Sequence, residues 1–314
     1  MTSRADGRRI VLVHAHPDDE TLNNGATMAR YAAEGAHVVL VTCTRGELGQ
    51  VIPPALEHLR HDRDGGLGEH RVRELADAMA ALGVTDHRFL DELPVGDAAG
   101  APARYHDSGM VWLADGQAGP VPDPAPGAFA LADADVAAAR LAALLREVRP
   151  QVLVTYEPGG GYGHPDHVQA HRVAHRAVEL AAWNRPGSPH AGSWAVPKVY
   201  WTVLPRDAVR ERLRELEGRV DLPFPVLAAD GPLPSMAVPD ELVTTVVDAT
   251  AHLPAKEAAL RAHATQVVVR DGFWGLADGP GQPLTGVEHY RLAVGTPSGP
   301  FDGDGREQDL FAGT

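Results

Sequence analysis

The sequence predicts an α/β protein with a doubly wound, Rossmann-like and mostly parallel sheet, helices on both faces, and a C-terminal extension. Short β-branched runs alternate with amphipathic helical segments, which is the pattern of parallel strands joined by helical crossovers. Two segments rich in histidine and aspartate each follow a buried strand, where ligands bind in sheets of this kind. We expect residues 1–314 to form a single domain, with a core over about 8–204 and a C-terminal part, 205–314, that completes the site.

A strand–helix–strand unit is predicted at the start of the chain. Residues 9–14 are apolar and β-branched, which indicates a buried parallel strand. A helix over about 24–34 should follow, because Gly35 is placed to end it, and residues 37–42 predict a second buried strand. This spacing is typical of a βαβ unit.

A further helix and a long loop are expected next. Apolar residues at helical spacing indicate a helix over 69–82, and a short strand over 88–90 should follow it. Residues 94–133 are rich in Gly, Pro, Ala and Asp and show little periodicity, which predicts a loop or insertion. Loops of this length in compact domains often carry function.

The alternation of strands and helices resumes after this loop. Helical periodicity and β-branched runs again follow one another, with Gly and Pro at the expected boundaries. The elements expected here are a helix over 133–149, a strand over 151–156, a helix over 165–183, a strand over 198–204, a helix over 206–217, a strand over 242–247 and a helix over 254–263.

The acidic composition excludes one class of partner. The formal charge is −14 at pH 7, whereas nucleic-acid binding normally requires a basic surface that releases counterions from phosphates. We therefore expect no nucleic-acid partner. Nearly all the positive charge is arginine and alanine is abundant, a bias typical of GC-rich genomes such as those of actinobacteria.

Cysteine usage and hydropathy indicate a cytoplasmic protein. Cys43 is the single cysteine, so no intramolecular disulfide and no multi-cysteine metal site is expected. The apolar run at 10–13 is too short for a secretory signal, and no stretch approaches the roughly 20 apolar residues that span a bilayer. We expect no membrane partner, and the sequence leaves the oligomeric state open.

Two polar segments at strand ends carry the candidate chemistry. Residues 16–20, His-Pro-Asp-Asp-Glu, place four ionisable groups after the first strand, which is costly unless a cation or substrate compensates them. Residues 159–167, Gly-Gly-Gly-Tyr-Gly-His-Pro-Asp-His, follow the strand over 151–156. Both contain His-Pro-Asp, whose proline keeps the histidine extended and favours the start of a helix.

These residue types predict a metal site. Imidazole and carboxylate groups together favour zinc or iron(II), and three protein ligands with an open position are typical of a catalytic centre. The spacing favours His16, Asp19 and His167 as ligands of one Zn per chain, with Fe(II) as the alternative. Asp18 is the candidate general base for a water molecule, although Asp18 or Asp19 could instead cap a helix.

His164 and Asp166 have further candidate roles. His164 is placed to be a cationic stabiliser or to protonate a leaving amine, and Asp166 could orient it. The glycines before them could cradle a phosphate, yet they lack the order of a dinucleotide or P-loop motif, so a flexible loop explains them better. The absence of Gly-x-Ser-x-Gly argues against a serine hydrolase.

The two motifs resemble those of the PIG-L (LmbE-like) deacetylases. The matched segments are 13–26, 41–49, 107–110, 154–167, 196–204 and 263–269. Together they are most similar to the branch of the family that acts on an N-acetylglucosaminyl-inositol in mycothiol biosynthesis. The resemblance implies a zinc-dependent hydrolase that releases acetate from 1-O-(2-acetamido-2-deoxy-glucopyranosyl)-myo-inositol, a small-molecule substrate.

The resemblance also implies roles for individual residues of the two motifs. Tyr162 matches a mobile tyrosine that helps to hold the oxyanion, although the residue by itself could be a packed loop aromatic. Carried over position by position, the other residues are the ligands His16, Asp19 and His167, the base Asp18, and His164 for transition-state stabilisation and amine protonation.

Candidate substrate contacts rest on the resemblance alone. Arg71 and Asp107 match residues that hold sugar or inositol hydroxyls, whereas their types alone would indicate solvated surface charges. Met110 lies in the same matched segment as Asp107. Gln50 stands where a glutamate is expected in related deacetylases, so the contact of that loop with inositol stays open.

Two alternatives to this deacetylase remain at the level of sequence. One is an amidase of mycothiol S-conjugates or another amino-sugar deacetylase, and the other is a catalytically silent sugar-binding protein. The intact Asp18 and His164 argue against the silent protein. Asn23 argues against the amidase, because a lysine is expected there in those enzymes and a neutral side chain should favour a small acetyl group.

Overall fold

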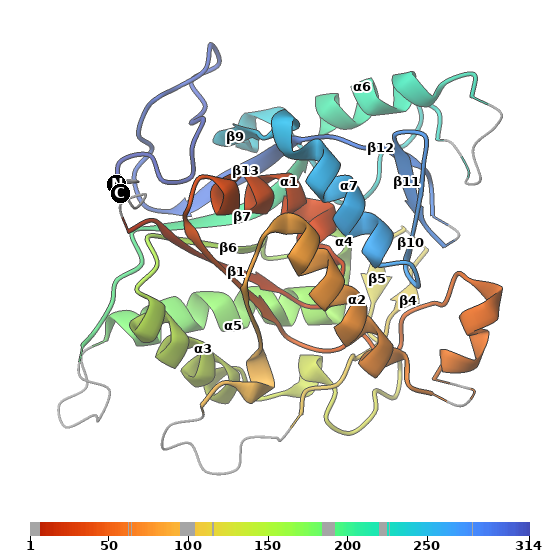
Figure 1. The fold of residues 1–314 in the computed structure, drawn as a ribbon, viewed down its shortest axis with the longest axis horizontal. Coiled ribbons are helices and arrows are strands. Elements are labelled where there is room, and N and C mark those ends of the chain that lie inside the picture. Colours follow the sequence, from red (N-terminus) through yellow and green to blue (C-terminus); the bar gives the residue numbers. More distant parts are fainter. Residues whose placement is uncertain are drawn as a thin grey trace.

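The fold is organised around an eight-stranded sheet with the strand order β3-β2-β1-β6-β7-β13-β9, in which β8 also pairs with β7 (Figure 1). The computed structural model describes residues 7–61, 63, 65–94, 104–114, 116–183, 192–219, 225, 227–277 and 279–314. The strands of this sheet are β1 Arg9–His14, β2 His37–Thr42, β3 Asp86–Phe89, β6 Val152–Tyr156, β7 Lys198–Pro205, β8 Ala237–Val238, β9 Thr245–Asp248 and β13 Val287–Val294.

Most of this sheet is parallel, which confirms the predicted fold class. The neighbours β3, β2, β1, β6 and β7 all pair in parallel register, and only β13 runs against them, between β7 and β9. The chain moves from β1 outward to β3, then returns to β6 on the other side of β1 and continues to β7. The strand order therefore reverses between β1 and β6, and ligands bind in such sheets beyond that point.

Helices cover both faces of the sheet. On one face Ile10 and Leu12 of β1 pack with residues of α1, α2 and α7, and on the other Val11 and Val13 pack with α3 and α5. This alternation follows from the two-residue period of a strand. The helices are α1 Asp19–Ala33, α2 Leu67–Leu82, α3 Ala134–Val148, α4 Gly160–Gly163, α5 Pro165–Ala182, α6 Arg206–Leu216 and α7 Leu253–Ala262.

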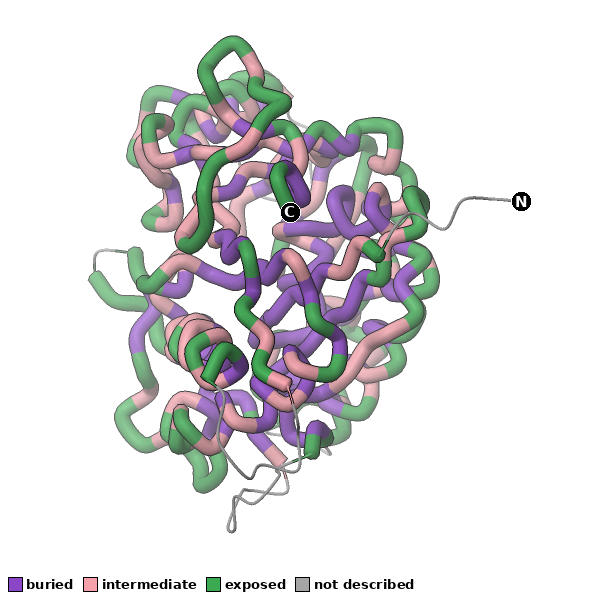
Figure 2. The backbone as a smooth tube through the Cα atoms, turned by 90° about the vertical axis from the view of Figure 1, so that its left-hand side faces the viewer, coloured by how far each residue is buried: buried purple, intermediate pink, exposed green. Residues whose placement is uncertain are grey.

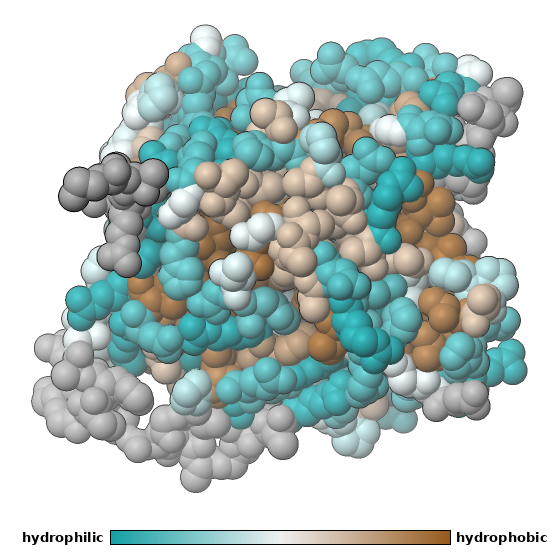
Figure 3. Space-filling model, in the orientation of Figure 1, coloured by the Kyte–Doolittle hydropathy of each residue, from teal (hydrophilic) through white to brown (hydrophobic). Residues whose placement is uncertain are grey.

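The surface views agree with this layered arrangement. Figure 2 shows the buried segments gathered inside the molecule, with exposed loops around them. Figure 3 shows mildly apolar residues across the middle of the face where Figure 1 places α1 and α7, bordered by hydrophilic surface. No helix in the described ranges is both long and apolar enough to cross a bilayer.

Two differences from the predicted elements bear on the site. The helix expected over 24–34 begins at Asp19, because the Asp18 carbonyl accepts the backbone N–H groups of Thr21 and Leu22. The predicted loop contains β4 Val111–Trp112 and β5 Ala118–Gly119, while its residues 95–103 and 115 lie outside the described residues.

The C-terminal part holds strands that the sequence patterns did not reveal. The strand β13 completes the main sheet, and a separate three-stranded antiparallel sheet contains β10 Val267–Arg270, β11 Phe273–Leu276 and β12 Gln282–Pro283. The helix α7 packs against α1 and α2. The C-terminal part therefore packs against α1, which begins within the first His-Pro-Asp motif, residues 16–20, and against α2, the next α-helix in the chain.

A buried ion pair ties this C-terminal part to α1. The Lys256 ammonium lies 2.7 Å from the Glu288 carboxylate, and both side chains are almost fully buried. Glu288 also accepts the backbone N–H groups of Ala26 and Thr27 at 3.0 and 2.8 Å. One carboxylate on β13 thus joins α7 to α1.

We expect Lys256→Met to lower the free energy of unfolding by about 3–5 kcal/mol, because it leaves the buried Glu288 charge without its cation. Urea denaturation followed by circular dichroism measures this change. Arg261→Met is the matched control on the same helix: its ion pair with Glu257 is solvent-exposed, so its loss should cost less than about 1 kcal/mol. Equal losses in the two variants would contradict a special role for the buried pair.

Candidate metal centre and active site

The two predicted motifs meet at the carboxyl ends of β1 and β6, where the strand order reverses. His16 and Asp19 follow β1, and His164 and His167 follow β6. All four side chains are buried, and the rings of His16 and His167 lie 5.3 Å apart between centroids. Within the described residues, two groups of donors have atoms within 4.8 Å of one another: His16, His164 and His167, and His16, Asp107, His164 and Asp166.

The surroundings of His167 leave one ring nitrogen free for a metal. Its Nδ1 lies 3.1 Å from the Gly160 carbonyl oxygen, so Nδ1 carries the proton and donates it. Its Nε2 is buried, has no hydrogen-bond partner in the part of the chain that the structure describes, and lies 3.4 Å from Asp19 Oδ2. A buried nitrogen lone pair beside a carboxylate is the arrangement that a metal ion satisfies.

His16 is oriented in the same way by a carboxylate. Its Nε2 lies 3.2 Å from Asp166 Oδ2, and that carboxylate is itself held by the backbone N–H and the hydroxyl of Ser108. With the Nε2 proton donated to Asp166, Nδ1 presents its lone pair toward Asp19 Oδ2 at 3.3 Å. Carboxylates that fix a histidine tautomer in this way are typical of metal sites.

Asp19 lies between the two histidines although it belongs to neither compact group of donors. Its Oδ2 is within 3.4 Å of both rings and accepts the backbone N–H of His16 at 2.9 Å. The competing donor His164 already uses Nδ1 to accept the Asp166 backbone N–H. Asp107 likewise accepts the backbone N–H groups of Leu48 and Gly109. His16 Nδ1 and His167 Nε2 therefore both lie within 3.4 Å of one carboxylate oxygen, Asp19 Oδ2.

Burial and charge shift the protonation of this cluster. Burial raises the pKa of the Asp19 carboxyl, but His167 and His16 more than offset it and hold the pKa well below its usual range. Burial lowers the pKa of His16, but Asp107, Asp166 and Asp19 raise it well above its usual range. The group of side chains around His16 and Asp19 thus carries an excess of carboxylates, which attracts a proton or a cation.

Asp18 has a strained backbone and a shifted carboxyl. Its φ of 115° lies in the left-handed half of the map, which a non-glycine residue adopts only when its surroundings impose it. Its backbone N–H donates to Glu20 Oε2 at 2.9 Å, and its carboxylate lies 3.1 Å from Arg71. Burial raises the pKa of Asp18 to about 6, against the opposing charge of Arg71. A carboxyl with this pKa suits a general base near neutral pH.

His164 caps α5 as a neutral ring. Its Nδ1 accepts the backbone N–H of Asp166 at 3.1 Å, which leaves the proton on Nε2. Burial lowers the pKa of His164 to about 2, and the neighbouring His16 and His167 add to this effect. The geometry corrects the expected role of Asp166: its carboxylate orients His16, whereas only its backbone contacts His164.

Tyr162 lies on a glycine-rich turn beside His167. Its ring centroid is 5.1 Å from that of His167 and 5.8 Å from that of Trp112, an indole that is 64% exposed. Gly160, with φ 69°, could not be replaced without a clash, because a Cβ there would lie 2.8 Å from the Cβ of His167. Gly160 therefore allows close packing against His167. On the opposite side, Tyr156 stacks on the His167 ring at 4.2 Å.

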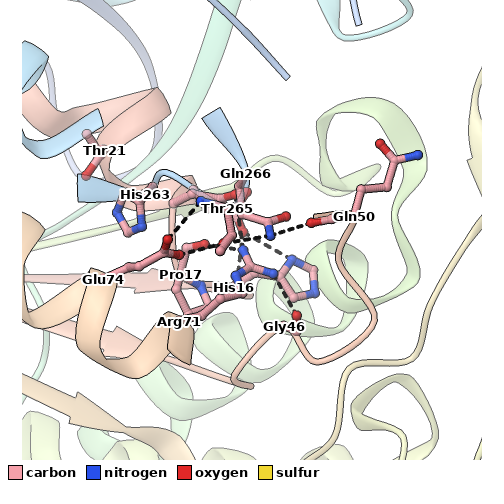
Figure 4. A network of polar contacts seen from close by, with 12 residues as sticks. His16, Pro17, Thr21, Gly46, Gln50, Arg71, Glu74, His263, Thr265 and Gln266 are labelled. Carbon is pink, nitrogen blue, oxygen red and sulfur yellow. Dashed lines mark hydrogen bonds and ion pairs between the residues drawn. The ribbon is translucent and has the colours of Figure 1, made fainter. Parts of the chain in front are cut away.

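Arg71 and Asp107 are buried rather than solvated. Besides Asp18, the Arg71 guanidinium binds the carbonyl oxygens of Pro17 and Gly46 (Figure 4). One oxygen of Asp107 lies 3.7 Å from His16 Nε2. Arg71 therefore contacts Asp18, and Asp107 lies beside His16. Both residues also bind the backbone of the surrounding loops.

The remaining predicted substrate contacts lie further out. The side-chain N–H of Asn23 donates to the Asp19 carbonyl at 2.9 Å, because Asn23 is in the second turn of α1 rather than at its start. Gln50 is exposed, and Figure 4 shows its side chain pointing away from Arg71 and His16. Met110 is half-buried just before β4.

Sequence reasoning missed several residues that build this site. Glu20 accepts the Asp18 N–H and lies 2.8 Å from His263, which is 243 residues away in the chain. Glu20 stood in the first motif and His263 in a matched segment, but no pattern linked them. Ser108 gave no signal, since small hydroxyl residues are common in loops.

Comparison with known proteins identifies the family of this chain. The family model of PIG-L, described as GlcNAc-PI de-N-acetylase, matches residues 11–178, which include both motifs. The chain belongs to the PIG-L family.

Curated PIG-L relatives match almost the whole chain. A protein of Kineococcus radiotolerans, named 1D-myo-inositol 2-acetamido-2-deoxy-alpha-D-glucopyranoside deacetylase, is 55% identical, covering 98% of this chain and 83% of the relative. A protein of Kribbella flavida with the same name is 50% identical over 99% of each chain. Among solved structures, GalB, the 4-carboxy-2-hydroxymuconate hydratase of Pseudomonas putida, matches with a TM-score of 0.54 at 18% identity, covering 94% of this chain and 100% of that one, which supports the fold alone.

We expect His167→Ala to yield folded protein that holds the metal at least about tenfold more weakly, because it removes a nitrogen donor from the cluster. Metal content after dialysis at equal protein concentration measures the loss. His175→Ala, on the same helix but hydrogen-bonded to Trp201, is the matched control and should keep full metal content. Full occupancy in His167→Ala would contradict the ligand assignment.

Proposed function

We propose that this PIG-L protein hydrolyses the N-acetyl group of 1-O-(2-acetamido-2-deoxy-glucopyranosyl)-myo-inositol, releasing acetate and the free amine, in mycothiol biosynthesis. The observation that carries this proposal is the buried His–Asp cluster beside Asp18, in a chain that is 55% identical to a relative named for this deacetylation. The substrate is a small amino-sugar molecule, and the protein is a hydrolase.

The structure and composition support two further proposals, one on the extent of the domain and one on its location in the cell. We propose that residues 1–314 act as one deacetylase domain, because His263 and Thr265 of the C-terminal part contact Glu20 and Glu74 next to the site. A cytoplasmic location suits the buried thiol of Cys43. The acidic net charge disfavours a nucleic-acid partner.

The proposed metal is zinc, held by His16, Asp19 and His167. When bound, zinc polarises a carbonyl oxygen and makes a coordinated water more acidic. The mixture of imidazole and carboxylate donors supports zinc, and it is also compatible with iron(II). Asp166 and the Gly160 carbonyl hold the two imidazole rings in the tautomers that present Nδ1 of His16 and Nε2 of His167.

Asp18 is proposed as the general base. Its carboxylate accepts a proton from the attacking water, and Arg71 holds the carboxylate from the side at 3.1 Å. The charge of Asp19 adds to burial in raising the pKa of the Asp18 carboxyl, so the two carboxylates act on one another.

His164 and Tyr162 are proposed to act on the substrate amide. The neutral His164 ring carries its proton on Nε2, so it donates a hydrogen bond to the developing charge, and the proton that Asp18 takes from the water passes to the leaving amine. Tyr162 donates its hydroxyl proton toward the oxyanion. Burial raises the pKa of the Tyr162 phenol well above its usual range, which keeps this donor protonated.

The sugar and inositol contacts are proposed around this centre. Arg71 and Asp107 border the base and His16, and Met110 follows on the same segment as Asp107. Asn23 lies one helical turn beyond Asp19. Gln50 belongs to a loop whose backbone is anchored by Gln266, so a contact with inositol requires its exposed side chain to turn inward.

The direct test of the proposal is acetate release over a panel of N-acetyl amino sugars with and without inositol, using zinc-loaded protein. The inositol-bearing substrate should have the highest kcat/KM. Release of acetate from none of these compounds would reject the proposal, and a preference for a sugar without inositol would reassign the substrate.

We expect Asp18→Asn to lower kcat by about 10² or more while most of the metal is retained, because the residue is a base and not a ligand. In the wild type, kcat should rise with pH as Asp18 loses its proton near its pKa of about 6, and this acidic limb should be absent from the variant. Metal analysis and a pH–rate profile measure both effects. Loss of metal in Asp18→Asn would place Asp18 among the ligands.

The identity of residue 23 should separate the deacetylase from the amidase. The neutral Asn23 leaves room for a small acetyl group without adding a fixed charge, so the wild type should prefer the acetylated glucosaminyl-inositol to a mycothiol S-conjugate. Asn23→Lys should narrow this preference, as measured by kcat/KM for both substrates. A wild type that cleaves the conjugate better would make the amidase the function.

A further inference from the structure

A segment of the C-terminal part, residues 263–266, contacts the first His-Pro-Asp motif, residues 16–20, through His263. It follows α7, and its His263 and Thr265 side chains are fully buried. Thr265 donates its N–H and its hydroxyl to Glu74 of α2 at 2.8 and 2.6 Å (Figure 4). His263 instead reaches Glu20, with Nε2 2.8 Å from Oε1. The segment is therefore anchored twice, by two different carboxylates.

Glu20 links His263 to the candidate base. Its side chain is fully buried, and its second oxygen accepts the backbone N–H of Asp18 at 2.9 Å. This peptide group belongs to the residue with φ 115°, a conformation that persists in a non-glycine residue only where neighbours impose it. The Glu20 carboxylate is one of those neighbours, so its position bears on where the Asp18 carboxylate lies.

The His263 ring has no other hydrogen bond that competes for it. Its Nδ1 is buried without a hydrogen-bond partner among the described residues, while Nε2 donates to Glu20. A carboxylate buried beside Asp18 and Asp19 requires an opposing donor or cation to stay in place. For Glu20 the donors are the His263 ring and the Thr21 hydroxyl, which both reach Oε1, and His263 is the only one of the two that can carry charge; for Asp18 the cation is Arg71.

We propose that His263 is a positioning residue for the deacetylation, acting through Glu20 on the backbone of Asp18. His263 holds the Glu20 carboxylate, Glu20 holds the Asp18 amide, and the Asp18 carboxylate is thereby presented to the water that it deprotonates. The inference rests on the proposed function, since it assigns to His263 an effect on the base of that reaction. Among the described residues, the hydrogen bond of His263 is to Glu20 and not to His16, Asp19 or His167.

The test is a double-mutant cycle between His263 and Asp18 in the zinc-loaded full-length chain. His263→Ala should lower kcat by about tenfold or more with KM within about twofold, because ground-state binding does not depend on the base. In an Asp18→Ala background the same change should alter kcat less than about twofold. Equal factors in both backgrounds would overturn the proposal, since a general loss of structure acts on both.

Two further variants separate positioning from folding. His263→Gln keeps an N–H donor for Glu20 and should restore kcat to within about threefold of the wild type. Thr265→Val removes the hydroxyl bond to Glu74 in the same segment without touching Glu20, and it should leave kcat within about twofold. A Thr265→Val loss as large as that of His263→Ala would show that the whole segment, not His263, matters.

Amide hydrogen exchange gives a readout that does not need activity. The Asp18 N–H should be protected in the wild type by its bond to Glu20, and His263→Ala should raise its exchange rate about tenfold while the amides of β2 keep theirs. Unchanged exchange at Asp18 would overturn the proposal. A protein that released no acetate would fail the proposed function, yet this measurement would still decide the positioning role.

Discussion

The structure depends on the compensation of three consecutive buried carboxylates at the end of β1. Asp18, Asp19 and Glu20 are all buried, and burial of uncompensated charge costs several kcal/mol for each group. Each carboxylate meets a partner from a different element: Arg71 from α2, His167 from α5, and His263 from the segment after α7. Because the charges of these three carboxylates must be compensated, distant parts of the chain come together at the end of β1.

The pKa shifts follow from how each partner is placed. Asp19 lies between two imidazoles and stays ionised, and Glu20 faces His263, which holds its pKa down to about 2 despite burial. For Asp18 the charge of Arg71 does not offset burial, so its pKa rises to about 6. Neighbouring carboxylates of the same kind therefore differ in proton affinity, which suits one as ligand and another as base.

The fold by itself does not determine this chemistry. The same arrangement of elements occurs in GalB, the 4-carboxy-2-hydroxymuconate hydratase, at 18% identity. The reversal of strand order between β1 and β6 supplies a place for ligands, and the residues that follow these two strands decide what is done there. A deacetylase is indicated by the near-full-length relatives together with the donors around Asp19 and the carboxyl of Asp18, not by the sheet.

The sequence alone was enough to predict the parallel strands β1, β2, β3, β6 and β7, most helices and the two motifs, because strand burial and the His-Pro-Asp patterns are local. It also brought His16, Asp19 and His167 to one sheet edge, since parallel strands end on the same side. The tertiary structure was needed to fix the orientation of side chains, such as the turn of the Asp166 carboxylate toward His16. It also placed β13 in the sheet and joined Glu20 to His263 across 243 residues. Contacts of that separation leave no periodic pattern in a single sequence.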